Sequence, residues 1–360
     1  MAVTNFAALT DEQKTVWSMQ FWKQARDNSF INKFAGTGEN SMIQRITELK
    51  KSEKGARAVI TLIADLEGDG VVGDNQLEGN EEAMASYDQV IQIDQMRHAN
   101  RNKGRMADQR SIVNFREQSR DKLAYWMADR IDQLAFLTLA GVSYSLYTDG
   151  STRVGSQLPQ LAFASDVSAP TTNRHLRWDA ATGLEAGNTA SVAAEDTATY
   201  AMIVELKAYA KEHFVRGIPT SEGEMFHLFL TPTAMSKLRL DPDFLANQRM
   251  AAARGSSNEL FKGTGSVMVD GVAVHEFRHV PHFSTWGGGA IAGCRGLFCG
   301  AQALGMADIG AAYWDEEEYD YGNSQGISIG KIMGLLKPKF YAKKTATTED
   351  FGVIAIDMAQ

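Results

Sequence analysis

The longest amphipathic pattern in the chain runs from residue 111 to residue 140. Its apolar positions recur at the spacing of one helix face, and the charged positions lie mostly on the opposite face. The apolar face comprises Ile112, Phe115, Ser119, Leu123, Trp126, Ile131, Leu134 and Leu137, and the charged face comprises Arg116, Arg120, Asp121, Arg130 and Asp132. At 1.5 Å per residue this pattern predicts a helix of about 45 Å. Gly141 is expected to end it.

Two segments with strand character flank a polar tip and predict a long two-stranded ribbon. Residues 57–66 are rich in β-branched residues. Within residues 86–96, one set of side chains alternates with another, namely Tyr87, Gln89, Ile91 and Ile93 with Asp88, Val90, Gln92 and Asp94. The tip between them is rich in glycine and carries the acidic residues Glu67, Asp69, Asp74, Glu78, Glu81 and Glu82. Because an isolated hairpin is marginally stable in water, we expect the ribbon to lie on another surface.

The remaining segments mix helices and strands. The expected helices are 195–213 and 233–240, and the expected strands are 226–230, 266–269, 272–280, 296–303, 327–331 and 351–357. Asp270-Gly271 predicts a turn, residues 142–194 have an irregular pattern with few apolar anchors, and the acidic run 315–321 predicts a solvated turn. Because helices and strands do not alternate regularly, the pattern favours an α+β fold over a doubly wound sheet.

The composition narrows the class of protein. The 360 residues contain 36 Lys and Arg against 44 Asp and Glu, and the net charge of −8 argues against a protein that grips nucleic acid with a broad basic face. The length suggests roughly two domains. Two cysteines exclude a disulfide scaffold and fit a reducing compartment. Since the chain has neither a membrane-length apolar run nor a signal-peptide pattern, we expect a soluble protein made in the cytoplasm, with no membrane partner.

One motif suggests metal chemistry, the literal H-E-x-x-H of His275-Glu276-x-x-His279. Zinc binds this motif when both histidines share one face of a helix. Here the surrounding pattern is strand, turn and strand, and Pro281 would end a helix at once. In a strand the two imidazoles would stand roughly 13 Å apart. We therefore expect a polar, partly exposed strand, and a zinc metallopeptidase remains the alternative function from another class.

Three weaker patterns have simpler interpretations. Asp65–Gly70 echoes a calcium loop, but Gln76 stands where a bidentate Glu is needed. Cys294 and Cys299 lack the spacing of a zinc site and are expected to be buried on a strand. Gly287–Gly293 is expected to be a flexible loop. No cofactor, metal site or catalytic residue is predicted, and we expect the protein not to be an enzyme.

The order of arm, ribbon, long helix and mixed sheets resembles the major capsid proteins of tailed bacteriophages with the Hong Kong 97-type fold. The tip segment Leu77-Glu78-Gly79-Asn80-Glu81-Glu82 is similar to the L-x-G-x-E-E stretch of one branch of that family. The resemblance implies an N-terminal arm (1–54), an extended loop (55–97), a peripheral domain (98–184 and 336–360) with the spine helix 111–140, and an axial domain (185–335). It also implies that the last strand, 351–357, returns to the peripheral domain.

The resemblance implies a structural function. Copies would assemble through pentamers and hexamers into an icosahedral shell around the phage's double-stranded DNA, which they would touch by weak non-specific contacts. Because the arm starts immediately, a separate scaffolding protein is expected. A portal protein is expected as a further partner, and a decoration protein is another candidate. The protein would be found in the virion after assembly in the bacterial cytoplasm. An encapsulin-like nanocompartment shares the fold, but the ribbon tip favours the phage interpretation.

Opposite charges on two segments suggest how copies would meet. The tip is acidic, whereas the segment after the ribbon carries Arg97, Arg101, Lys103, Arg105 and Arg110. We expect the tip of one copy to lie against basic residues of its neighbour, giving register more than affinity; the alternative is two independent solvated loops. The residues expected at contacts between copies are Trp17, Trp22, Leu77, Glu78, Glu81, Glu82, Arg97, Arg101, Lys103 and Arg105. For the tryptophans the alternative is packing on the chain's own core.

Overall fold

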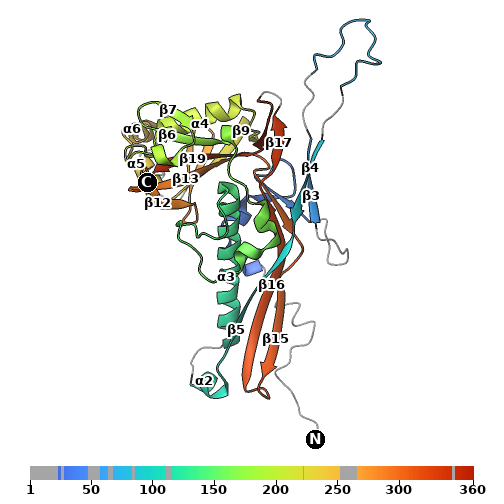
Figure 1. The fold of residues 1–360 in the computed structure, drawn as a ribbon, viewed down its shortest axis with the longest axis vertical. Helices are drawn as coiled ribbons and strands as arrows, with labels where there is room; N and C mark the ends of the chain where they lie inside the picture. The colour runs from blue at the N-terminus through green and yellow to red at the C-terminus, as the bar shows by residue number, and fades with distance from the viewer. Residues whose placement is uncertain are drawn as a thin grey trace.

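The computed structural model contains two large β-sheets joined by one long helix (Figure 1). It describes residues 23–25, 28–47, 57–63, 68–82, 86–110, 115–221, 223–251, 266–342 and 345–360. Trp17, Trp22, Glu67 and Ile112 lie outside these ranges, so the predictions for them stay predictions. None of the helices in the described ranges is long and apolar enough to cross a membrane.

The six-stranded sheet forms the lower blade of the molecule in Figure 1. Its strands are β1 (Ala35–Gly36), β2 (Ile43–Ile46), β14 (Leu304–Asp308), β16 (Ser324–Leu336) and β15 (Tyr313–Tyr319), in that order, with β5 (Asp94–Arg101) also paired to β16. Two separate hairpins lie near its upper end: β3 (Arg57–Ile63) with β4 (Ser86–Gln92), and β17 (Lys339–Ala342) with β18 (Thr347–Asp350).

The nine-stranded sheet lies at the other end of the long helix. Its main path is β10 (Ser266–Val269), β11 (Val272–Glu276), β9 (Gly223–Leu230), β13 (Ile291–Cys299), β19 (Val353–Ala359), β6 (His175–Asp179) and β7 (Gly183–Ala186); β12 (His282–Trp286) pairs with β13, and β8 (Ile218–Thr220) with β9. Alternate residues of β9 serve opposite faces. Phe226, Leu228 and Leu230 join one buried cluster, whereas Phe229 joins the other.

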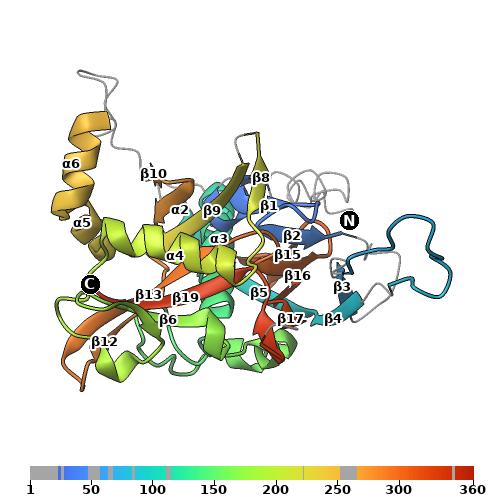
Figure 2. The ribbon, with the colours of Figure 1, turned by 90° about the horizontal axis from the view of Figure 1, so that it is seen from above.

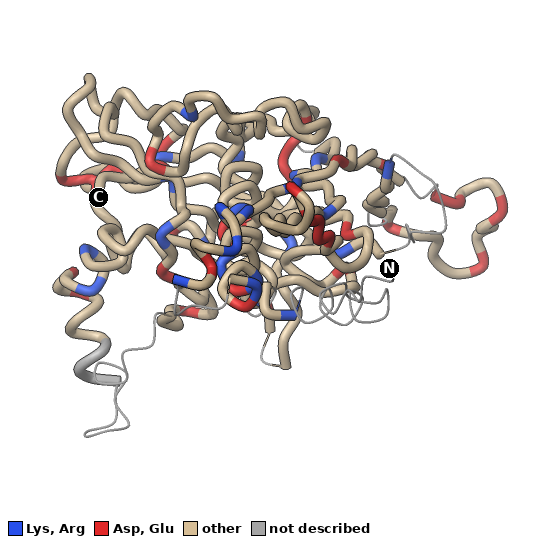
Figure 3. The backbone as a smooth tube through the Cα atoms, turned by 90° about the horizontal axis from the view of Figure 1, so that it is seen from below, with Lys and Arg blue, Asp and Glu red and all other residues tan. Residues whose placement is uncertain are grey.

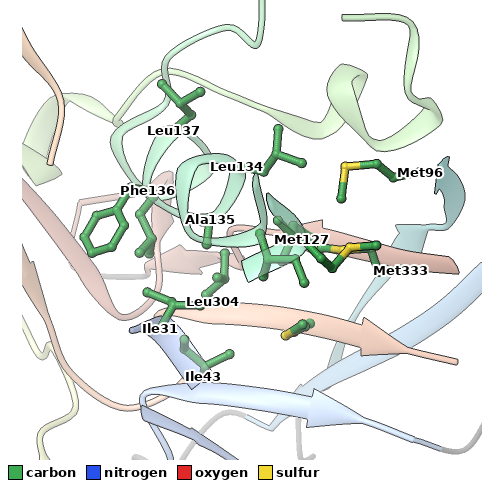
Figure 4. Close-up of a cluster of buried hydrophobic side chains, with 14 of the residues drawn as sticks. Ile31, Ile43, Met96, Met127, Leu134, Ala135, Phe136, Leu137, Leu304 and Met333 are labelled. Carbon is green, nitrogen blue, oxygen red and sulfur yellow. The ribbon is translucent and has the colours of Figure 1, made fainter. Parts of the chain in front are cut away.

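Helices cover both faces of this sheet. The helices are α2 (Arg105–Gln109), α3 (Phe115–Ala140), α4 (Tyr200–Glu212), α5 (Pro232–Leu240) and α6 (Pro242–Ala251). Short 3₁₀ turns occur at η1 (Ile31–Phe34), η2 (Leu158–Gln160), η3 (Ala162–Asp166), η4 (Thr172–Arg174) and η5 (Thr189–Ser191). Residues of α4 and α5 share one cluster with β9, and the C-terminal half of α3 shares the other (Figures 2 and 4).

The predicted long helix is confirmed as α3, with one correction. Its C-terminal part, residues 131–140, is buried on every side, so the amphipathic pattern describes only its first half. Asp132, expected on the charged face, is 3% exposed because the backbone of residues 30 and 31 covers and bonds it. Gly141 ends the helix as expected: its φ is +67°, and Val142 N donates to Leu137 O at 2.9 Å.

The strand expected over 86–96 is two strands, β4 and β5, which are separated at Ile93. β5 pairs antiparallel with β16 and places Arg97 opposite Gly330 and Arg101 opposite Gly326. The first basic residues after the ribbon are therefore part of the six-stranded sheet rather than of a connector. The backbone groups of these residues bond to β16 whichever side chains they carry. The charged sequence therefore gave no sign of a strand.

The acidic run 315–321 is wrong as a turn, because its first five residues belong to β15. Arg116 of α3 donates two hydrogen bonds to Glu316, at 2.9 and 2.8 Å, while Glu317 and Glu318 are exposed at the edge of the sheet. Edge strands tolerate charge because it discourages unwanted pairing. The acidity therefore marked an edge strand, and the turn follows it.

Residues 142–194 are more ordered than expected. They include β6 and β7, and Tyr144, Phe163 and Trp178 are buried there. The helix expected from residue 195 begins at Tyr200, where the Thr199 hydroxyl accepts from Met202 N. The single helix expected over 233–240 is α5, but α6 follows because proline is compatible with a first helical turn.

Most later strands are confirmed with shifted ends. β10 and the Asp270-Gly271 turn occur as predicted, with φ of +45° and +75° in the turn. The strand expected over 272–280 ends at 276, that expected over 296–303 spans 291–299, and that expected over 327–331 lies inside the longer β16. The last strand, expected over 351–357, spans 353–359. β12, β14, β17 and β18 were not predicted.

The expected domain ranges remain a prediction. The last strand, β19, pairs with β6 from the expected peripheral range and with β13 from the expected axial range. Likewise, β5 of the expected peripheral range begins within the residues assigned to the extended loop and pairs with β16. Both sheets therefore cross the boundaries that the resemblance implies.

Candidate intersubunit surfaces

The ribbon tip, residues 68–82, extends away from the body of the molecule (Figures 1 and 3). All of these residues except the half-exposed Val71 are exposed, and Leu77 is 61% exposed. The loop is held by its own groups: Gly68 N donates to the Glu82 carboxylate at 2.6 Å, and Gly79 N donates to Glu81 at 2.7 Å. Of the four tip residues predicted at contacts between copies, Glu81 and Glu82 therefore stabilise the loop itself. The side chains of Leu77 and Glu78 are exposed, which fits a contact with another copy.

The base of the ribbon is anchored, but its outer face is open. Residues alternate along β3, so that Ala58, Ile60 and Leu62 are buried. On β4, the Gln89 amide both donates to Lys339 O and accepts from Lys339 N. The exposed face carries Val59, Ile63 and Val90, which are 50%, 56% and 42% exposed. This face would gain from a covering partner.

The predicted basic residues lie at the end of the molecule farthest from the ribbon tip, on β5 and around the start of α2 (Figure 1). Arg97 and Lys103 are exposed. Arg101 Nε donates to Ser324 Oγ at 2.8 Å, and its guanidinium lies 4.2 Å from the centre of the Tyr319 ring. Arg105 Nε donates to Gly322 O at 3.0 Å. Arg101 and Arg105 therefore brace the β15–β16 hairpin of their own chain.

Small residues of β16 let side chains from both neighbouring strands lie across it. A Cβ at Gly326 would be 2.8 Å from Tyr319 Cε2, and one at Gly330 would be 3.0 Å from Arg97 Cγ. In the paired register, Arg101, Gly326 and Glu317 form one row across the three strands. In this part of the six-stranded sheet, β16 is therefore flanked by the basic strand β5 on one side and the acidic strand β15 on the other.

The H-E-x-x-H residues do not form one site. His275 Nε2 lies 3.0 Å from His227 Nδ1, whereas His279 Nε2 lies 2.7 Å from Asp129 Oδ1. The two histidines of the motif therefore have separate partners, and no group of three or more potential metal ligands occurs among the described residues. His279 is buried, which corrects the expectation of a partly exposed strand through residue 280.

The cysteine prediction is confirmed for burial. Cys294 and Cys299 both lie on β13 and are fully buried. Burial raises the pKa of the Cys294 thiol to about 12, so it stays protonated at neutral pH. The loop expected over Gly287–Gly293 is shorter than predicted: residues 287–290 form the turn between β12 and β13, and residues 291–293 already belong to β13.

The sequence patterns missed the groups that tie the start of the chain to its core. The Asp132 carboxylate accepts from Ser29 Oγ at 2.6 Å, Phe30 N at 2.8 Å and Ile31 N at 3.1 Å. The available signal was an acidic residue inside the most apolar stretch of the helix. A charge at such a position is retained when several donors satisfy it.

Comparisons with known proteins agree with the fold. A family model described as phage capsid protein matches residues 5–360. The major capsid protein of Pseudomonas phage KPP25 is 60% identical over 367 residues, covering 99% of this chain and 97% of that protein. The capsid of Ralstonia phage GP4 has a TM-score of 0.76 and 28% identity, with 92% of this chain and 90% of that chain covered. The cyanophage Pam1 capsid asymmetric unit has a TM-score of 0.71 and 20% identity, with 99% of both chains covered.

Proposed function

Because the chain belongs to the phage capsid protein family and is a major capsid protein of the phage head shell, we propose that it assembles through pentamers and hexamers around double-stranded DNA. Its α+β architecture is the Hong Kong 97-type capsid fold. It is a structural protein of the virion, not an enzyme, which excludes the metallopeptidase alternative and leaves the encapsulin-like one without support.

The observation that carries this proposal is the ribbon, which leaves apolar side chains uncovered in a single chain. Val59, Ile63, Val90 and Leu77 are each more than two-fifths exposed. Contact with a neighbouring copy would remove these side chains from water. This burial stabilises the contact by about 25 cal/mol for each Å² of apolar area. A closed shell covers such projections in every copy and leaves no unpaired end.

Charge provides the register for this contact. We propose that Leu77 and Glu78 of one tip lie against Arg97 and Lys103 of the next copy. The acidic tip and the basic strand β5 are far apart in the folded molecule, so they cannot contact each other within one copy. Their opposite charges therefore favour a contact between two copies. Attraction between exposed charges contributes mostly to orientation and association rate. The net charge of −8 also suits a shell wall that holds DNA without binding it tightly.

Reversing two of the exposed basic charges, with Arg97→Glu and Lys103→Glu together, is expected to reduce shell formation at least tenfold. We prefer this pair to Arg101 and Arg105, whose reversal would also break the hairpin contacts of their own chain. Sedimentation velocity and negative-stain microscopy would measure the yield of shells. Adding Asp74→Lys and Glu78→Lys should restore part of the yield.

The matched control has the same change in net charge elsewhere. Lys122 and Lys237 are exposed on α3 and α5, and their reversal should leave assembly near the wild-type level. Normal shells from the Arg97→Glu/Lys103→Glu variant would refute the proposed contact, while the assignment to the capsid family would stand.

Electron microscopy of the expressed chain tests the assembly itself. We expect rings or shells with fivefold and sixfold units when the chain is produced with its scaffolding protein. A chain that stays monomeric at high concentration with that protein present would contradict the proposal. The separate scaffolding protein, the portal protein, a decoration protein, weak contacts with packaged DNA and assembly in the bacterial cytoplasm are parts of the same proposal.

A further inference from the structure

Two aromatic residues near the start of the described chain pack against two histidines of the nine-stranded sheet. We call residues 28–34 the arm root. The Phe34 ring lies edge-on to the rings of His227 and His275, with 5.0 Å between centres in both cases. Phe30 stacks on Phe277 at 4.1 Å. The arm root therefore rests on the face of β9 and β11 that α4 and α5 leave uncovered.

The histidine pair beneath the arm root requires a defined protonation state. His227 Nδ1 and His275 Nε2 are 3.0 Å apart, so one nitrogen must carry a proton and the other must be bare. His227 is 9% exposed, and rings of Phe34 and Phe229 surround the pair. Such surroundings replace few of the hydrogen bonds that water gives to an imidazolium ion.

The charged groups near the pair also oppose protonation. Lys33, in η1, faces His275 and places its ammonium group 5.5 Å from the Phe30 ring. From β13, Cys299 is the register partner of His227, and its buried thiol stays neutral because burial raises its pKa. From α3, Asp132 bonds the arm root itself. Among the described residues, no carboxylate acts on either imidazole.

These surroundings lower the pKa of both rings. Burial, followed by the neighbouring His275, lowers the pKa of His227 to about 4. Burial, followed by Lys33, lowers the pKa of His275 to about 4. Both rings therefore stay neutral at pH 7, and their hydrogen bond persists while the arm root is docked.

We propose that the His227–His275 pair is an acid-sensitive latch, which holds the arm root at neutral pH and releases it when the pair takes up protons. The first proton preserves the hydrogen bond but places a cation beside Lys33 in aromatic surroundings. The second proton makes both facing nitrogens donors, so the bond is lost. Release exposes the imidazoles to water, where they bind protons more readily.

The sign of the pH dependence follows from the two states. Each ring has a pKa of about 4 when docked and an ordinary value of 6.5 when released. The latch is therefore at full strength above pH 6.5. It weakens as the pH falls from 6.5 to about 4, and it weakens no further below that. At pH 5 each histidine should favour release by about 20-fold relative to pH 7.

Hydrogen exchange of assembled shells, read by mass spectrometry, tests the latch. The amides of Phe30 and Ile31 report release because both donate to Asp132 while the root is docked. After correction for intrinsic exchange rates, their protection should fall at least about 20-fold between pH 7 and pH 5. The double variant His227→Phe/His275→Phe keeps the aromatic packing without a titrating ring, so its protection should fall much less.

Two comparisons make the outcome decisive. Titration of Asp132 affects wild type and double variant alike, so the difference between them isolates the histidines. His98→Phe, which alters an exposed histidine stacked on Trp126, should keep the wild-type response. If the double variant forms no shells, His227→Phe alone must still reduce the loss of protection. An equal loss in wild type and in the histidine variants would overturn the proposal.

Discussion

Replacing Asp132 by Ala is expected to lower the free energy of unfolding by about 3–5 kcal/mol. The change leaves three donors, from Ser29, Phe30 and Ile31, without the acceptor that they share. Each buried donor that loses its partner costs about 1–3 kcal/mol. A urea titration of the unassembled full-length chain, followed by tryptophan fluorescence, would measure the loss.

Two milder variants grade this effect. Asp132→Asn keeps one acceptor oxygen and nearly the same volume, so it should lose about half as much stability. Ser29→Ala removes a single donor and should cost about 1 kcal/mol. If Asp132→Ala lay within 1 kcal/mol of wild type, the carboxylate would not anchor the arm root.

The second large effect is expected at Lys337, where replacement by Met should cost about 3–5 kcal/mol. Lys337 Nζ lies 2.9 Å from the Asp350 carboxylate, and both side chains are fully buried. The variant leaves Asp350 charged in the interior, with the bond from Thr171 N as remaining support. The pair lies where the chain passes from β16 through the β17–β18 hairpin to β19.

The double variant separates the charge from the packing. Lys337→Met with Asp350→Asn removes both charges while keeping similar volumes, so it should recover most of the loss. Buried ion pairs replaced as a unit are often neutral in stability, whereas half of a pair is costly. Apparent melting temperatures of shells and urea midpoints of the free chain would both report the difference. A double variant as unstable as the single one would place the cost in packing.

The sequence predicted the elements whose patterns arise from local geometry. The α3 periodicity, the β3 alternation and the Asp270-Gly271 turn each follow from the side chains of a few neighbouring residues. Element order and the tip stretch then sufficed for the family, since the order of elements depends on no distant contact.

What failed depended on partners far along the chain. Glu316 is in a strand because β16 pairs with it and Arg116 bonds it, and neither partner is near in sequence. Asp132 is buried because residues about a hundred positions earlier fold over it. The different roles of the basic residues after the ribbon likewise became apparent only in the folded structure. All four of these residues, Arg97, Arg101, Lys103 and Arg105, are exposed, but Arg101 and Arg105 also donate hydrogen bonds to the β15–β16 hairpin of their own chain.

The opposite placement of the tip and the basic strand gives each subunit a direction. A link between two different ends is head-to-tail, so every copy in a ring reaches in the same rotational sense. A copy without its tip could still accept a neighbour but could not reach the next one. If the proposed contact holds, a single such copy would open a ring at one seam, and a minority of defective chains would dominate a mixed population.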